Sequence, residues 1–207
     1  MLRWLILLCA LVATGTANAA LVAVPSPANS SLPACMGLCP LGDMHFSVVV
    51  RDLANNPIAG STVVLDFTNC PGALICPFHP SDPYAVNQRR LSMVTDASGS
   101  VTFPARVGGI GPAGAVAVFA DGVLLKGYAL ASPDQNGNGV AVNIIDVDET
   151  IFASKLGTTD PTADFDCDGD VDVFDQFIFN PHLSHSCDGI VDAVRRGTWG
   201  TLKEHYR

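Results

Sequence analysis

The sequence has few basic side chains and, beyond its first residues, no long apolar run. It contains 11 Lys and Arg against 20 Asp and Glu, which gives a formal net charge of −9. No later window reaches the roughly 20 apolar residues that a membrane-spanning helix requires. The scarcity of positive charge argues against nucleic acid and anionic membrane surfaces as partners. We therefore expect a chain that neither binds nucleic acid nor inserts into a membrane after its N-terminal segment is removed.

The sequence also lacks the common catalytic motifs. No G-x-S-x-G, P-loop or H-E-x-x-H pattern occurs, and His45, His79 and His205 are isolated. The stretch from His182 to Cys187 could be interpreted as a metal cluster or as a nucleophile with its base. The simpler interpretation is that Cys187 forms a disulfide. The expectation is a protein that is not an enzyme and has no catalytic residues.

The first 19 residues have the pattern of an export signal. Arg3 precedes the apolar run Leu5 to Val12, and Ala17-Asn18-Ala19 supplies the small residues that signal peptidase needs. This pattern predicts cleavage before Ala20 and a secreted, extracellular or cell-surface protein.

Six cysteines remain after the signal, an even number in an oxidising compartment, which favours disulfides. Three short bridges are the simplest pairing, namely Cys35–Cys39, Cys70–Cys76 and Cys167–Cys187, although fifteen pairings are possible. A zinc site that uses Cys35 and Cys39 is the alternative, but no second pair of matching spacing accompanies them.

The residue pattern in the middle of the chain is typical of a β-protein. After an extended segment at 20–43, short β-branched runs alternate with Gly, Pro and Asn turns, a spacing typical of a sandwich. The expected strands are 45–50, 61–67, 91–95, 100–103, 113–120 and 123–130.

Two patterns within residues 44–131 carry a resemblance to a family. One is Val50-Arg51-Asp52 with Asn56-Pro57-Ile58-Ala59-Gly60-Ser61-Thr62-Val63, and the other runs from Thr95 to Phe103. Both are similar to the bacterial immunoglobulin-like domains of surface and adhesion proteins. The resemblance implies an immunoglobulin-like β-sandwich and says little about function.

The acidic residues are concentrated in one segment. Eleven lie between Asp134 and Asp175 against the single base Lys155, so this segment carries −10 and the remainder +1. Within it, the loop 164–175 places acids at positions 1, 3, 5, 9 and 12 and a glycine at position 6. This is the spacing that wraps a short loop around Ca²⁺. The candidate ligands are Asp164, Asp166, Asp168, Asp170 through its backbone carbonyl, Asp172 and Asp175.

A second copy of the loop lies upstream and is less regular. Asp134, Asn136 and Asn138 supply leading ligands, and Asp146 is the candidate for the terminal one. Asp134 to Asp146 counts thirteen residues, so one residue among 140–142 is an insertion. Because two Asn replace Asp, this site is expected to be the weaker of two calcium sites.

Each loop is followed by a short predicted helix. Ile144, Val147, Ile151 and Phe152 are expected to share one apolar face before Gly157. In the second helix, the expected apolar face consists of Val173, Phe174, Phe177 and Ile178.

Paired loops of the form Asp-x-Asp/Asn-x-Asp/Asn-Gly, each followed by a helix, resemble the dockerin type I module. The resemblance covers about 134–187 and implies two calcium ions and docking onto a cohesin partner. At loop positions 10 and 11, where cohesin-binding members often carry small hydroxyl residues, this sequence has Ile144-Ile145 and Val173-Phe174. This departure argues against cohesin docking but not against calcium binding.

The predicted organisation is a signal peptide (1–19), an extended segment (20–43), a sandwich (44–131), a dockerin-like module (132–187) and a tail (188–207). It suggests a secreted calcium-binding structural or attachment protein of the bacterial surface or matrix. Copies could assemble into a fibre if the apolar lead-in 20–24 adds a strand to a neighbour. The alternative is a carbohydrate-associated accessory subunit that docks onto a cohesin-like scaffold.

Overall fold

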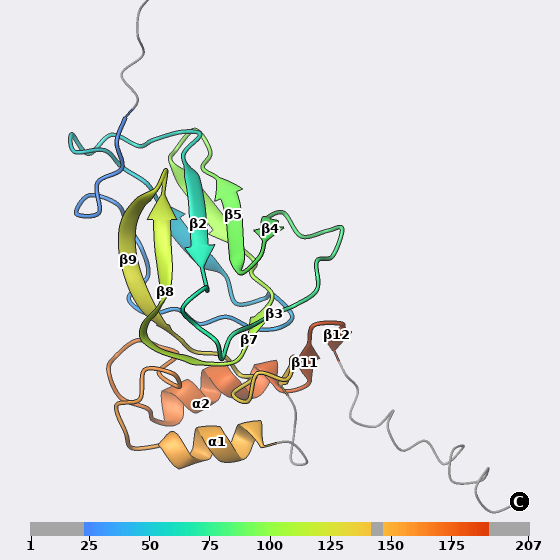
Figure 1. Cartoon of the computed structure of the whole chain (residues 1–207). Helices are drawn as coiled ribbons and strands as arrows, with labels where there is room; N and C mark the ends of the chain where they lie inside the picture. Colours follow the sequence, from blue (N-terminus) through green and yellow to red (C-terminus); the bar gives the residue numbers. More distant parts are fainter. Residues whose placement is uncertain (1–22, 142–146, 191–207) are drawn as a thin grey trace, which may run out of the picture.

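The computed structural model describes residues 23–141 and 147–190. The expected signal peptide and almost all of the expected tail lie outside the described residues. The chain is mainly β, with two short helices that lie beneath the strands in Figure 1. None of the described helices is long and apolar enough to cross a membrane.

A five-stranded sheet forms the larger layer of the β part. Its order is β4 (Ala85–Asn87), β5 (Arg90–Val94), β2 (Thr62–Asp66), β8 (Gly111–Ala120) and β9 (Val123–Leu130), and all neighbours are antiparallel. Antiparallel neighbours can be joined by tight turns, which is why Gly, Asn and Asp recur between these strands. A separate two-stranded pair joins β3 (Leu74–Ile75) to β7 (Val107–Gly108).

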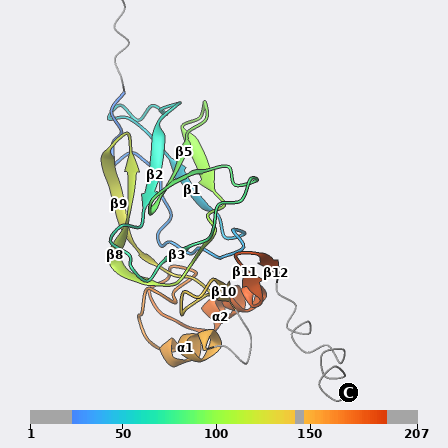
Figure 2. The same ribbon diagram turned by 45° about the vertical axis from the view of Figure 1, so that its right-hand side comes forward.

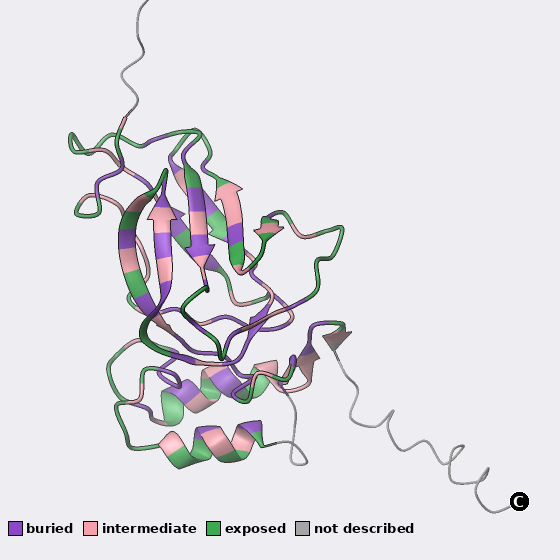
Figure 3. Ribbon diagram, in the orientation of Figure 1, coloured by how far each residue is buried: buried purple, intermediate pink, exposed green. Residues whose placement is uncertain are grey.

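The second layer is the antiparallel pair β1 (Phe46–Val49) and β6 (Ser100–Phe103). Its inward residues and those of the larger sheet belong to one hydrophobic cluster. The ring of Phe46 on β1 meets that of Tyr128 on β9 edge to face, with centroids 5.4 Å apart. Buried residues alternate with less buried ones along several strands, as the purple and pink bands of β2 and β8 show in Figure 3. The predicted strands are therefore confirmed, with small differences at their ends.

The lead-in segment is extended but packed on the β part. Pro25 and Ser31 form isolated bridges with Asp52 and Val49, next to β1. Further along, the Lys126 ammonium and the Tyr128 hydroxyl donate hydrogen bonds to the Pro33 carbonyl at 3.0 and 2.8 Å. Because its carbonyls are bonded by side chains from β9, this segment is held on the β part without forming a long strand.

The helical module closes the end of the β part (Figure 2). It contains β10 (Val140–Ala141), α1 (Asp148–Lys155), α2 (Val173–Phe179), the 3₁₀ turn η1 (Asn180–His182), β11 (His185–Ser186) and β12 (Gly189–Ile190). The three short strands form an antiparallel sheet in the order β10-β11-β12.

A second hydrophobic cluster lies inside this module. Phe152 of α1 and Phe179 of α2 stack with ring centroids 4.4 Å apart and an interplanar angle of 9°. The predicted apolar face of the second helix is wrong in part, because Val173, Phe174 and Phe177 are 49%, 59% and 65% exposed. The reason is that buried Asp175 and Phe179, four residues apart, define the inward face and turn their neighbours outward.

The disulfides differ from the predicted short bridges. Cys35 pairs with Cys167 and Cys76 with Cys187, while Cys39 and Cys70 are free and buried. Both bridges tie the β part to the helical module, across sequence separations of 132 and 111 residues. Sequence spacing could not reveal these cysteine pairs, because the pairs depend on how the β part and the helical module pack against each other. Two disulfides suggest an extracellular, oxidising environment.

Candidate metal centre

The loop 164–175 lies between the two helices and turns sharply at Gly169. This glycine has φ +101°, in a region that residues with a side chain rarely adopt. Val171 is fully buried, and its backbone exchanges hydrogen bonds with the segment after α1, to Gly157 and Thr158. Val171 thus attaches the loop to the rest of the module.

The leading acids of this loop are brought together by hydrogen bonds to the backbone. Asp164 accepts from the Cys167 and Gly169 amides at 2.7 and 3.1 Å, and Asp166 accepts from the Asp168 amide at 3.2 Å. One oxygen each of Asp164, Asp166 and Asp168 lies within 4.8 Å of the others. The predicted ligands at positions 1, 3 and 5 therefore converge.

Asp175 organises the end of the same loop from the first turn of α2. Its side chain is fully buried, and its two oxygens accept from the amides of Phe165, Asp166 and Asp172 at 2.6, 3.2 and 2.8 Å. In return, the Asp172 side chain accepts from the Phe174 amide at 2.6 Å, which completes a capping box. Asp170, Asp172 and Asp175 form a second close group.

The negative charge of the loop is costly without a counterion. Slight desolvation and the nearby carboxylates of Asp175, Asp168 and Asp164 hold the pKa of Asp166 above its usual value. The charge of Asp168, followed by slight desolvation and the charge of Asp172, raises the pKa of Asp170. A cation bound among these oxygens would remove this repulsion.

The upstream loop repeats the hydrogen bonds of the downstream one at the same spacing. Asp134 accepts from the Gly139 amide, as Asp164 does from Gly169. The Asn136 side chain accepts from the Asn138 amide, as Asp166 does from the Asp168 amide. The Asn138 side chain accepts from the Val140 amide, as Asp168 does from the Asp170 amide. The leading parts of the loops are therefore offset by 30 residues, and Asp134, Asn136 and Asn138 occupy the predicted positions.

An acid that the sequence analysis did not select, Asp148, lies at the end of the upstream loop. Asp146, the predicted residue, lies outside the described residues. Asp148 instead is fully buried at the start of α1 and accepts from the Asn136 amide at 2.9 Å, just as Asp175 accepts from Asp166. The residues four positions after these two acids, Phe152 and Phe179, are the stacked pair. Asp148 is therefore the counterpart of Asp175, and the upstream loop is three residues longer.

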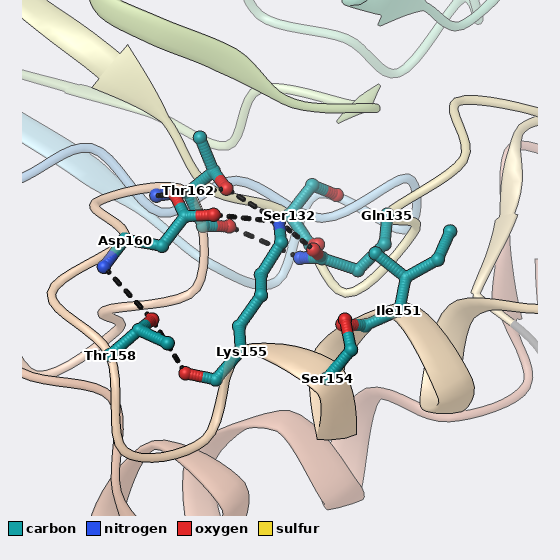
Figure 4. A network of polar contacts seen from close by, with 8 residues as sticks. All are labelled: Ser132, Gln135, Ile151, Ser154, Lys155, Thr158, Asp160 and Thr162. Atoms are coloured by element: carbon teal, nitrogen blue, oxygen red, sulfur yellow. Dashed lines mark hydrogen bonds and ion pairs between the residues drawn. The ribbon is translucent and has the colours of Figure 1, made fainter.

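Lys155, the only base of the acidic segment, supports the upstream loop (Figure 4). Its ammonium donates to the Gln135 side-chain carbonyl at 2.7 Å and to the Thr162 hydroxyl, and lies 3.5 Å from an oxygen of Asp160. Burial holds the pKa of Lys155 below its usual value, and the charge of Asp160 opposes this effect. The contact joins the second residue of the upstream loop to the segment that leads into the downstream loop.

The donor set of both loops consists of carboxylate and amide oxygens. Such atoms suit hard divalent cations, and the two groups of aspartates in the downstream loop could hold a metal ion. No family model, curated protein or solved structure matches the chain.

Proposed function

We propose that the protein is a secreted, non-catalytic, calcium-binding structural or attachment protein of the bacterial surface or matrix. In this proposal, the β part is an immunoglobulin-like sandwich, and residues 132–187 are a dockerin-like module with two calcium sites. Calcium fixes the module, and the module closes one end of the sandwich.

One observation carries the calcium proposal. In both loops, the side chains of the first, third and fifth residues accept matching hydrogen bonds from backbone N–H groups. Each loop ends in a fully buried acid, Asp148 or Asp175. Backbone N–H groups arrange each loop around this carboxylate, and a cation-binding loop uses the same carboxylate to close the coordination sphere from the following helix.

The ion that fits best is Ca²⁺. Loops of this length offer several carboxylates and backbone carbonyls, which suits a cation that takes six to eight oxygens in flexible geometry. Mg²⁺ prefers six ligands in strict octahedral geometry and keeps its waters.

Calorimetric titration of the purified protein should detect two calcium sites. With a dissociation constant of order 10⁻⁴ M, about 1 mM Ca²⁺ stabilises the fold by about 1.4 kcal/mol per site, which raises the melting temperature. Asp168→Ala should remove one site, and Asp188→Asn, an equal loss of charge on the exposed residue that follows the module, should remove none. No heat on adding calcium, together with an unchanged melting temperature, would reject the proposal.

A second candidate function is docking onto a scaffold partner through α2. The specific observation is the exposed apolar row Val173, Phe174 and Phe177, in which the two phenylalanine rings lie 6.5 Å apart. Large exposed aromatic side chains are common at the centre of protein interfaces. In the dockerin family, loop positions 10 and 11, here Val173 and Phe174, are the partner-binding positions.

Pull-down against a panel of cohesin domains tests this candidate. Binding that is lost in the double variant Phe174→Ser/Phe177→Ser, whose calcium affinity should not change, would support it. Retention of cohesin binding in that variant would show that this face is not the docking surface.

The fibre hypothesis stays a prediction. Residues 25–31 already bridge β1 of their own chain, so a donated strand would have to come from the residues before them. Electron microscopy of concentrated, calcium-loaded protein that shows only monomers would count against it.

A further inference from the structure

A cluster of four side chains outside the acidic loops joins the lead-in segment to the end of the helical module. Cys39 and Asp43 come from the turn that precedes β1, His182 ends η1, and His185 begins β11. One ligand atom of each residue, a sulfur, a carboxylate oxygen or an imidazole nitrogen, lies within 4.8 Å of the other three. The two pairs are about 140 positions apart in the sequence and meet only in the fold.

Four of the six distances among these atoms match those of a tetrahedral metal site. The distance is 3.3 Å between the Nδ1 atoms of His182 and His185, and 3.1 and 3.2 Å from these to Oδ2 of Asp43. The sulfur of Cys39 lies 3.5 Å from Nδ1 of His185. In a tetrahedron with metal bonds of about 2.0 Å to N or O and about 2.3 Å to S, neighbouring ligands are about 3.3 Å apart for N and O, and about 3.5 Å for N and S.

We propose that Cys39, Asp43, His182 and His185 form a zinc site that attaches the lead-in segment to the helical module. The mixed S, N and O donor set favours a borderline-soft transition metal, unlike the oxygen donors of the acidic loops. Four protein ligands fill a tetrahedral shell, so the site is structural and leaves no position for a reacting water.

The surroundings of Cys39 suit a metal-bound thiolate. Its side chain is fully buried and not in a disulfide, although the chain has two disulfides. The Leu41 backbone N–H donates to the Cys39 sulfur and would stabilise a metal-bound thiolate.

The histidines are equally suited to the role. Imidazole nitrogen is a common ligand of zinc, and both rings bring Nδ1 to within 3.2 Å of Oδ2 of Asp43. The side chains of His182 and His185 are 16% and 12% exposed, whereas that of Asp43 is 37% exposed. An ion can therefore enter from the exposed side of Asp43 and bind next to the three less exposed ligands.

Ion pairing alone explains this cluster less well. Both Nδ1 atoms converge on the same oxygen of Asp43 while facing each other at 3.3 Å. Two protonated rings would repel at that distance, and two neutral rings that both donate to Asp43 would place their N–H groups next to each other. A cation at the centre satisfies all four atoms at once.

Cobalt substitution tests the site in the intact protein. The metal-stripped protein is saturated with Ca²⁺, so that the acidic loops are occupied, and is then titrated with Co²⁺. We expect one equivalent to bind with the visible spectrum of tetrahedral cobalt and a sulfur-to-cobalt charge-transfer band. Addition of Zn²⁺ should displace the cobalt and abolish both features.

Variants assign the ligands. Cys39→Ser should lose the charge-transfer band, and His182→Gln and His185→Gln should lose binding of the single equivalent. The matched controls are Cys70→Ser, which removes the other free buried cysteine, and His79→Gln, which removes an exposed histidine; both should bind as the unaltered protein does.

X-ray absorption of the zinc-loaded, unaltered protein makes the test independent of whether the variants fold. One sulfur and three N or O ligands would support the proposal. A shell of oxygen atoms only, a cobalt spectrum without a sulfur band, or a band that persists in Cys39→Ser would overturn it. Because calcium is saturating throughout, failure here leaves the calcium proposal untouched.

Discussion

At the scale of single residues, the acids of the downstream loop fall into two kinds. Asp175 is fully buried and accepts three backbone N–H groups, so it shapes the loop whether or not an ion is bound. Asp168 is exposed and accepts one, from Asp170. Asp175 therefore supports the fold and would also bind the proposed ion, whereas Asp168 would chiefly bind the ion.

This difference predicts unequal stability in the absence of calcium. Asp175→Ala should lower the free energy of unfolding by about 1–3 kcal/mol, because it leaves buried N–H groups without an acceptor. Asp168→Ala, a change on the surface, should alter it by no more than about 0.5 kcal/mol. Urea unfolding in excess chelator measures both, and equal losses would contradict the assignment.

The same residues show how far a sequence can predict a site. The downstream ligands follow from spacing alone, because glycine, apolar anchor and acids all fall within twelve residues. Asp148 was missed because three extra residues separate it from the leading ligands, and only its buried contact with Asn136 identifies it. The spacings Cys39-x₃-Asp43 and His182-x₂-His185 were visible signals, but nothing in the sequence says that they meet.

At the scale of elements, α1 and α2 are joined by a single aromatic contact. The Phe152–Phe179 stack is reinforced by Phe165 of the downstream loop, whose ring centroid lies 6.1 Å from that of Phe152 and 6.3 Å from that of Phe179. Helical periodicity correctly placed Phe152 inside but put Val173, Phe174 and Phe177 there too. The apolar pattern alone could not show that a carboxylate, Asp175, takes an inward position on α2.

Phe179→Ala should separate the helices and weaken both calcium sites. Loss of a fully buried phenylalanine costs about 3–5 kcal/mol. Phe177→Ala is the matched control on the same helix, because that side chain is 65% exposed and should change stability by less than about 0.5 kcal/mol. Thermal unfolding with and without calcium compares them. If the two variants melted alike, the stack would not hold the helices together.

At the scale of the whole molecule, each disulfide attaches one of the two candidate metal-binding loops to the β part. Cys167 is the fourth residue of the downstream loop and is bonded to Cys35 of the lead-in segment. Cys187, bonded to Cys76, donates its backbone N–H to the carbonyl of Gly139 in the upstream loop at 2.9 Å. The pairing of cysteines thus depends on how the β part and the helical module pack together. The sequence patterns predict each part but not their packing.

The two bridges should therefore affect different calcium sites. Each closes more than 100 residues, so removing one should cost up to about 4–5 kcal/mol of stability. Cys35→Ser/Cys167→Ser should weaken mainly the downstream site, because its loop loses its attachment, and Cys76→Ser/Cys187→Ser mainly the upstream one. Calorimetry resolves this when each double variant is compared with Asp168→Ala, which lacks the downstream site. If both double variants weakened the same site, the disulfides would act on global stability alone and not on the individual loops.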